Sequence, residues 1–163
     1  MYTDIILTEK TEAIENFAKY LGYDKIFFEE DFKKLSIAFG SAIDKNRILI
    51  EKKRINLLIN PHLDSRKDKL NERITGLNQV LLKLAKQNHI SIGLTLDQFS
   101  SRESLGRITS IIKLCRKYKV NLYVFSLAKS KYQLKSVSDI ISLLKISGFT
   151  PGEAKLALTY SKS

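Results

Sequence analysis

The sequence holds little of what most enzyme centres require. It has one cysteine, two histidines and seven glycines in 163 residues, and no tryptophan. Two histidines, His62 and His89, cannot supply the several imidazoles of a typical metallohydrolase site. No glycines stand in dinucleotide-binding or P-loop spacing, and no serine occupies a Gly-x-Ser-x-Gly elbow. Metal-dependent hydrolysis, nucleotide hydrolysis and serine-based catalysis are therefore disfavoured.

Disulfides, membrane spans and linkers are absent from the pattern as well. The lone Cys115 excludes an internal disulfide and lies in an apolar stripe, where a thiol acts as a small hydrophobe. No apolar run approaches the roughly 20 residues of a spanning helix, and the first residues lack a signal-peptide layout. The two prolines and seven glycines mark no domain boundary. We expect a single domain over residues 1–163, located in the cytoplasm.

Positive charge is abundant and unevenly distributed. Residues 1–44 hold five lysines against nine acids, residues 45–100 eleven basic residues against five acids, and residues 101–163 twelve against three. A generally lysine-rich proteome would not leave the first segment acidic, although a solvated basic face is the alternative explanation. Polarised basicity of this kind favours a polyanionic partner, because phosphate neutralisation releases counterions without requiring a base sequence. The charge pattern therefore predicts nucleic-acid binding.

The first half of the chain predicts a β-α-β-α opening. Strands are expected at Tyr2–Leu7 and Lys25–Phe28, with a helix capped by Thr8 between them and a second helix from Asp31 to Gly40. Arg47–Ile50 and Ile55–Ile59 are then predicted as two more strands. Only Glu51–Arg54 joins them, which is too short for a parallel crossover. Either the two strands form a hairpin or an element is missing.

The second half predicts further alternation of helices and strands. Helical pattern runs from Asp64 to Gln87, divided by Gly76, and is followed by a strand at Ile90–Leu96, a helix at Arg102–Tyr118, a strand at Asn121–Ser126 and a helix at Val137–Ile146. Thr150, Pro151 and Glu153 form a capping box that begins a last helix. The alternation predicts an α/β fold built on parallel strands, either open or closed into a barrel.

Three carboxylates follow predicted strands, where barrel enzymes place their active sites. Glu29, Glu51 and Asp97 occupy such positions. None is paired in sequence with a second acid or a histidine, so solvated loop charge is the favoured explanation.

Two blocks of sequence resemble one known family. The first runs from Ser126 through Ala128 and the lysines at 129, 131 and 135 to Asp139, and continues to Glu153-Ala154-Lys155. The second contains Asn60-Pro61, Arg66-Lys67-Asp68 and Gly76-Leu77-Asn78. Their order and spacing resemble the thirty-kilodalton protein subunit of archaeal and eukaryotic ribonuclease P, called ribonuclease P protein component 3 in archaea. The likeness covers residues 55–163 well and the first half loosely.

This resemblance implies an α/β barrel of the triosephosphate-isomerase type. The sequence departs from the family pattern at three places: residues 69–75 are inserted, the connection between Ile50 and Ile55 is short, and Val137 replaces a common proline. The expectation is a TIM-barrel-like, reduced or incomplete barrel that lacks at least one βα element.

The resemblance also implies a function and partners. Family members assist the catalytic RNA that removes the 5′ leader of precursor tRNA. Without that RNA they do not act as nucleases. The implied partners are ribonuclease P RNA, precursor tRNA and a small ferredoxin-like protein subunit, which pairs with the family as a heterodimer or heterotetramer. No cofactor is expected for the protein itself, whereas Mg²⁺ is expected for the RNA-catalysed reaction.

Candidate RNA-binding residues follow from matched positions and from charge. The family motifs place Arg66, Lys67, Lys131, Lys135 and Lys155 in this role; charge alone adds Arg102 and Lys129. Tyr132 either stacks on a base or packs on the barrel rim. Asp139 is expected to cap a helix start or to order the basic loop. No catalytic or metal-binding residue is predicted.

Two alternative functions remain at the level of sequence. One is a TIM-barrel phosphoesterase with a degenerate site, which would use residues such as Asp97 or Glu51. The other is a generic RNA-binding protein that acts outside ribonuclease P.

Overall fold

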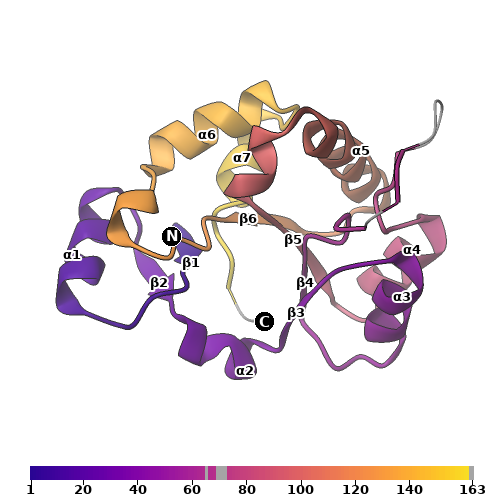
Figure 1. Ribbon diagram of the computed structural model, residues 1–163, viewed down its shortest axis with the longest axis horizontal. Helices are drawn as coiled ribbons and strands as arrows, with labels where there is room; N and C mark the ends of the chain where they lie inside the picture. The colour runs from indigo at the N-terminus through magenta and orange to yellow at the C-terminus, as the bar shows by residue number, and fades with distance from the viewer. Residues whose placement is uncertain (65, 69–72, 162–163) are drawn as a thin grey trace. The chain divides into compact units, whose positions relative to one another are not determined.

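The computed structural model describes residues 1–64, 66–68 and 73–161, which fall into two compact units (Figure 1). The first unit combines Met1–Lys34 with Tyr123–Ser163, and the second is Leu35–Leu122. The expectation of a single domain over residues 1–163 stays a prediction. No helix among the described residues is long and apolar enough to cross a membrane.

The first unit is built on parallel strands β1 (Thr3–Ile5) and β2 (Lys25–Phe27), with helix α1 (Glu12–Tyr20) between them in sequence. Thr11 caps α1 by accepting the Ile14 N–H, so the predicted cap at Thr8 is wrong. Strand β6 (Leu122–Phe125) leads into this unit, followed by α6 (Val137–Ile146) and α7 (Pro151–Leu156). The helix bounds of α6 and the capping box of α7 are confirmed.

The second unit contains three parallel strands in the order β3 (Ile37–Phe39), β4 (Leu57–Ile59) and β5 (Ser91–Thr95). Helices α3 (Ile43–Glu51), α4 (Gln79–Gln87) and α5 (Arg102–Tyr118) follow them in turn. The bounds of α5 match the prediction, and Ile108, Ile112 and Cys115 form its buried stripe. This succession of strand and helix is the repeating unit of parallel α/β folds.

Two predicted elements in this region are wrong. The short helix α2 (Phe32–Leu35) stops at Ser36, whose φ of 52° leaves the helical region, and the predicted rest of that helix is strand β3. Arg47–Ile50 belongs to α3 rather than to a strand, because Asn46 and Ile50, one helical turn apart, are both fully buried. The chain therefore forms no hairpin at Glu51–Arg54, and no element is missing there, because α3 leads directly to β4.

The predicted helical segment from Asp64 to Thr75 is also wrong for its described residues. Asp64, residues 66–68 and residues 73–75 are not helical, while residues 65 and 69–72 of the insertion lie outside the described residues. Across the whole described part the chain forms six strands, whereas a complete (β/α)8 barrel has eight.

Pro61, just after β4, lies between two glycines that allow close backbone approach. A Cβ on Gly76 would lie 1.7 Å from the Pro61 carbonyl oxygen, and one on Gly40 would lie 2.4 Å from the Pro61 Cα. Buried Asn46 ties the same region together, because its Nδ2 donates to the carbonyl oxygens of Ser41, Pro61 and Gly76, each at 2.9 Å. The carboxyl ends of β3 and β4 are thereby held in one arrangement.

Gly76→Ala is expected to destabilise the chain strongly, because Gly76 has a φ of +66° and no room for a methyl group. The expected loss is about 2–5 kcal/mol in the free energy of unfolding, combining left-handed strain with overpacking. Gly152→Ala is the matched control, since a Cβ there meets nothing within 4 Å inside a helix. Urea unfolding checks both; equal midpoints would refute the proposed packing of Pro61.

Candidate nucleic-acid interface

The loop after β4 carries two of the predicted RNA-binding residues. Asn60, with a φ of 49°, turns the chain out of the strand, and its side chain exchanges two hydrogen bonds with Thr95 at 2.7 and 3.0 Å. Beyond this anchor the chain passes Arg66 and Lys67, both exposed. Arg66 donates two hydrogen bonds to the Asp64 carboxylate, at 2.9 and 2.6 Å, and these bonds lower the pKa of Asp64.

A buried arginine on α5 holds this loop in place. The Arg107 guanidinium, in a residue only 6% exposed, donates to the carbonyl oxygens of His62, Asp64 and Arg66 at 3.1, 3.3 and 2.9 Å. It also bonds the carboxylates of Asp68, at 2.9 Å, and Glu103, at 2.7 Å. A planar group with five donors suits such a set of acceptors. Arg107 therefore fixes the backbone from which Arg66 and Lys67 project.

Asp68 is a structural partner in this arrangement. Burial opposes its ionisation, but the Ile74 N–H, the Arg73 side chain and the charge of Arg107 together hold the pKa of Asp68 below its usual value. Within the Arg66-Lys67-Asp68 motif, the acid anchors the loop and the two cations face solvent. Arg102 is exposed at the start of α5, the helix that also carries Arg107. The hydrogen bonds of Arg107 therefore bring the loop close to the first turns of α5.

Arg107→Leu is expected to lower the free energy of unfolding by about 3–5 kcal/mol, because it leaves Asp68 and several carbonyl groups buried without their donor. Arg102→Leu on the same helix is exposed and is expected to change stability by about 0.5 kcal/mol or less. Chemical denaturation of both variants checks the contrast. A similar small effect for the two would show that Arg107 does not hold the loop.

The loop after β6 carries the other predicted residues, in the first unit. The buried Asp4 carboxylate accepts the backbone N–H groups of Ser126, at 2.7 Å, and Ile5, at 2.8 Å. Ser126 in turn accepts the Ala128 N–H, and Leu7 donates to the Ala128 oxygen at 2.8 Å. The Ser-x-Ala segment is thus joined to β1, and the basic loop starts from a fixed point.

The lysines of that loop are all available to solvent. Lys129, Lys131 and Lys135 are exposed, and the Lys131 amine lies 5.1 Å from the centre of the Tyr132 ring. Tyr132 is 81% exposed, so of the two alternatives the packed rim position is wrong. An exposed ring beside a cation offers a stacking surface for a base.

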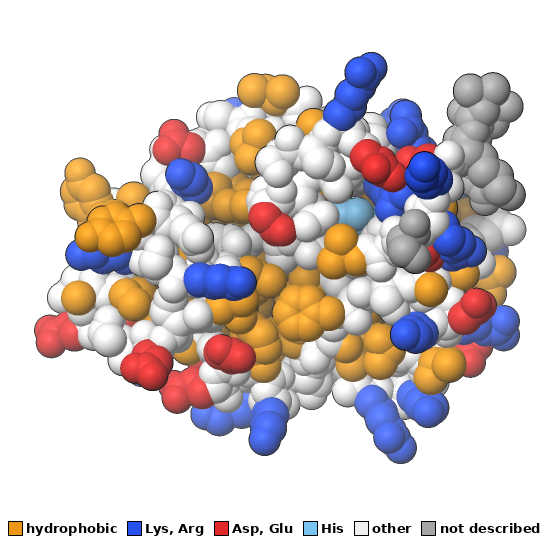
Figure 2. Space-filling model, viewed as in Figure 1, with side chains coloured by type: hydrophobic (Ala, Val, Ile, Leu, Met, Phe, Trp, Pro, Cys, Tyr) orange, Lys and Arg blue, Asp and Glu red, His pale blue; other side chains and the backbone are white. Residues whose placement is uncertain are grey.

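Two further predicted residues lie on the last helices. Ser136 caps α6 by accepting the Asp139 N–H at 3.2 Å, so the expectation that Asp139 is the cap is wrong. Asp139 instead lies in the first turn of α6, where its negative charge interacts favourably with the helix dipole. Lys155 is exposed on α7. Figure 2 shows Lys and Arg side chains projecting at many separate points of the visible face.

The stability of the first unit is expected to depend on pH through Asp4. Burial raises the pKa of Asp4 from 3.8 to about 6, so the folded chain binds this proton more tightly than the unfolded chain does. Stability should therefore fall as the pH rises from about 4 to about 6. Relative to Asp4→Asn, the wild type should lose up to about 3 kcal/mol over this window. Urea unfolding at several pH values checks this; parallel profiles would contradict it.

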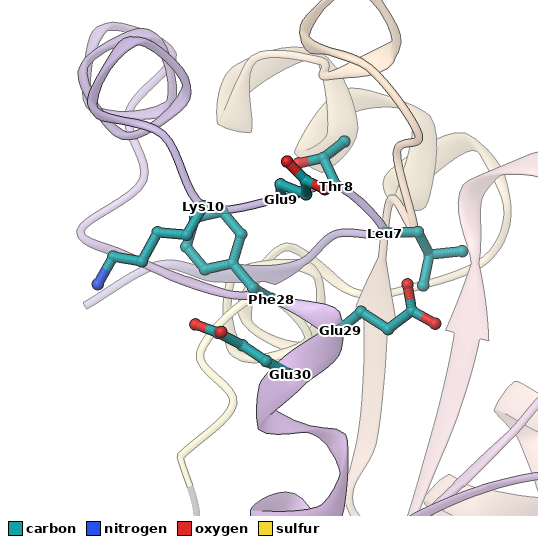
Figure 3. A pocket seen from close by; sticks show the side chains of 7 residues that line it. All are labelled: Leu7, Thr8, Glu9, Lys10, Phe28, Glu29 and Glu30. Atoms are coloured by element: carbon teal, nitrogen blue, oxygen red, sulfur yellow. The ribbon is translucent and has the colours of Figure 1, made fainter.

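Potential metal ligands do not gather in the described part of the chain. No group of three histidine, cysteine or acidic side chains there could hold a metal ion. A pocket of about 550 Å³ follows β1 and β2 and is lined in part by Glu29 and Glu30. Figure 3 shows these two carboxylates pointing away from each other.

The other strand-end carboxylates and the buried histidine lie on different elements. Glu51 ends α3 and pairs with Arg47 at 2.6 Å, so its predicted place after a strand is wrong. Asp97 is exposed after β5 and accepts a hydrogen bond from Gln98 at 2.7 Å. Burial lowers the pKa of His62, which is 1% exposed.

The two groups of predicted residues belong to different units. Arg66, Lys67 and Arg102 are in the second, and Lys129, Lys131, Tyr132, Lys135 and Lys155 are in the first. Sequence reasoning missed Arg107 and Asp4, which order the two loops. The only local signal was a charged residue inside an apolar pattern: Arg107 adjoins Ile108 on the α5 stripe, and Asp4 precedes Ile5 and Ile6.

Known proteins resemble this chain in sequence, and a solved structure resembles it in fold. The family model described as RNase P subunit p30 matches residues 45–163. The chain is 33% identical over 129 residues to ribonuclease P protein component 3 of Methanosarcina acetivorans, covering 76% of this chain and 51% of that protein. It is 31% identical over 135 residues to the protein of the same name from Methanothermobacter thermautotrophicus, covering 78% and 52%. The chain spans about half the length of these curated relatives.

A chain in a cryo-EM structure of archaeal ribonuclease P with mature tRNA has a similar fold. The TM-score is 0.61 at 17% identity, over 95% of this chain and 76% of that chain. In the described part, six strands alternate with helices, and the paired strands are parallel. Together with this likeness, they define a TIM-barrel-like α/β protein with an incomplete barrel. The chain belongs to the RNase P subunit p30 family.

Proposed function

We propose that this chain is an RNA-binding protein subunit of ribonuclease P, which assists the catalytic RNA in removing the 5′ leader of precursor tRNA. The observation that carries the proposal is the family match over residues 45–163. Two loops that present exposed basic side chains agree with it. The protein is not catalytic on its own in this account.

The proposed contacts are to phosphate groups. Arg66 and Lys67 project from the loop that Arg107 holds, and Arg102 lies at the start of the same helix. In the first unit the contacts come from the second loop and from α7, through Lys129, Lys131, Lys135 and Lys155, with Tyr132 stacking on a base. Such contacts position an RNA without reading its sequence. Fixed backbones reduce the entropy lost when the RNA binds.

The proposal includes the partners and setting that the family resemblance implies. The RNA partners are ribonuclease P RNA and precursor tRNA, and the protein partner is a small ferredoxin-like subunit. Mg²⁺ serves the RNA-catalysed reaction, and the protein itself requires no cofactor. The place of action is the cytoplasm. No observation favours the phosphoesterase alternative, whose carboxylates Glu51 and Asp97 occupy separate, exposed positions.

Removing two lysines of the β6 loop is expected to weaken binding to a ribonuclease P RNA transcript. For Lys131→Gln/Lys135→Gln, the slope of log affinity against log salt should become shallower by about 2, one per lost phosphate contact. The matched control is Lys19→Gln/Lys33→Gln, which removes the same charge from two exposed positions of the acidic N-terminal segment. Filter binding at several salt concentrations measures the slopes.

Reconstitution then tests the function itself. Wild-type protein added to ribonuclease P RNA and the other subunits is expected to increase cleavage of precursor tRNA, and the double variant less so. If the wild type binds RNA but gives no stimulation, the chain is a generic RNA-binding protein. If the wild type binds no ribonuclease P RNA at all, the proposal fails.

A further inference from the structure

The second unit has another basic surface, at the amino ends of its strands. Three short segments lead from the helices there to the next strands: residues 52–56 after α3, residues 86–90 from the last turn of α4, and residues 116–121 from the last turn of α5. We call these three segments the turn surface. Its basic residues are Lys52, Lys53, Arg54, Lys86, Arg116, Lys117 and Lys119, together with His89, and it contains no acid. Arg66 and Lys67, by contrast, follow the carboxyl end of β4.

Backbone hydrogen bonds place the three turns side by side. The Asn56 N–H donates to the Ser36 oxygen, the Ser91 N–H to the Asn56 oxygen, and the Ile92 N–H to the Asn121 oxygen, each at 2.9 Å. The Asn88 side chain adds a bond of 2.9 Å to the Ile50 oxygen, joining the end of α4 to the end of α3. Neighbouring strands lie about 4.8 Å apart, so the turns form one continuous edge.

Five cations of this edge are exposed, and the described acids do not neutralise them. Lys52, Lys53, Arg54, Lys86 and Lys119 are exposed, and none forms an ion pair with a described acid. The nearest acid in sequence, Glu51, is already bonded to Arg47 at 2.6 Å. Folding alone would favour spreading such like charges apart, because they repel at short range.

The backbone of the three turns has a second feature in common. Lys53, His89 and Lys119 all have left-handed φ values, of 50°, 56° and 54°. Glycine is the residue most common where a helix ends in this conformation, and other residues cost about 1–2 kcal/mol there. A basic or imidazole side chain occupies the strained position in all three turns. The helix dipole favours cations in the last turn, but it does not require this choice.

We infer that the turn surface binds the phosphate backbone of an RNA, as a second contact separate from the loop of Arg66 and Lys67. This inference rests on the proposed function and extends it to a new surface. A protein partner is disfavoured, because stable protein interfaces need a buried apolar centre and none of the exposed large hydrophobic residues lies in the three turns. An RNA backbone requires only cations at suitable intervals.

The test removes one lysine from each turn. Lys53→Gln/Lys86→Gln/Lys119→Gln is compared with the matched control Lys19→Gln/Lys33→Gln/Lys45→Gln, which loses the same charge at three exposed positions outside the turns. The probe is a ribonuclease P RNA transcript, and affinity is measured from low to moderate salt. The turn variant should bind about tenfold more weakly or worse, with a salt slope shallower by about 2–3, while the control stays near the wild type. Replacing the same three lysines by arginine should restore binding.

Each other outcome has a distinct meaning. If the wild type binds and the turn variant behaves like the control, this inference is overturned while the proposed function stands. A lower unfolding midpoint with unchanged RNA affinity would assign the lysines to the helix ends alone and would also overturn it. Failure of the wild type to bind the transcript would instead remove the proposed function, and this inference with it.

Discussion

The hydrogen bonds of Arg107 to Asp68 and to three backbone carbonyl groups hold the loop after β4 in the second unit. A guanidinium taken out of water is costly unless all its donors are used, and here they bond two carboxylates and three backbone oxygens. If the loop after β4 moved away, the buried Arg107 guanidinium would lose its hydrogen-bond acceptors. Asp4 has a comparable part in the first unit, where it holds the start of the β6 loop.

These interactions separate the residues that build the surface from those that we propose to contact an RNA. Asp68, Asp4 and Arg107 are buried or partly buried and bonded within the protein, whereas Lys67, Lys131 and Lys135 are exposed. Binding to phosphate demands exposed cations on a rigid backbone and no reacting groups. These features agree with the proposed role as a scaffold for RNA, in which the RNA carries out the cleavage.

Sequence patterns predicted some elements to the residue and misread others for physical reasons. Helices α5 and α6 were predictable because each has a long amphipathic period and begins after a serine, Ser101 or Ser136, that caps it. Strand β3 and helix α3 were not, because three-residue strands carry little periodicity and the run Arg47–Ile50 is rich in branched side chains. The candidate RNA-binding lysines were predicted from the charge pattern and from the family motifs. Apart from Glu103, the partners of Arg107 lie about forty residues away in the chain, beyond any local pattern.

A site-directed cleavage experiment tests the central claim most directly, because Cys115 is buried and burial raises the pKa of its thiol to about 12. A cysteine placed at Lys67 would thus be the one reactive thiol to carry an iron chelate that generates hydroxyl radicals. A loop held by Arg107 against bound ribonuclease P RNA should cut the RNA at one or two discrete positions. Weak cutting spread along the whole transcript, or none, would contradict the account.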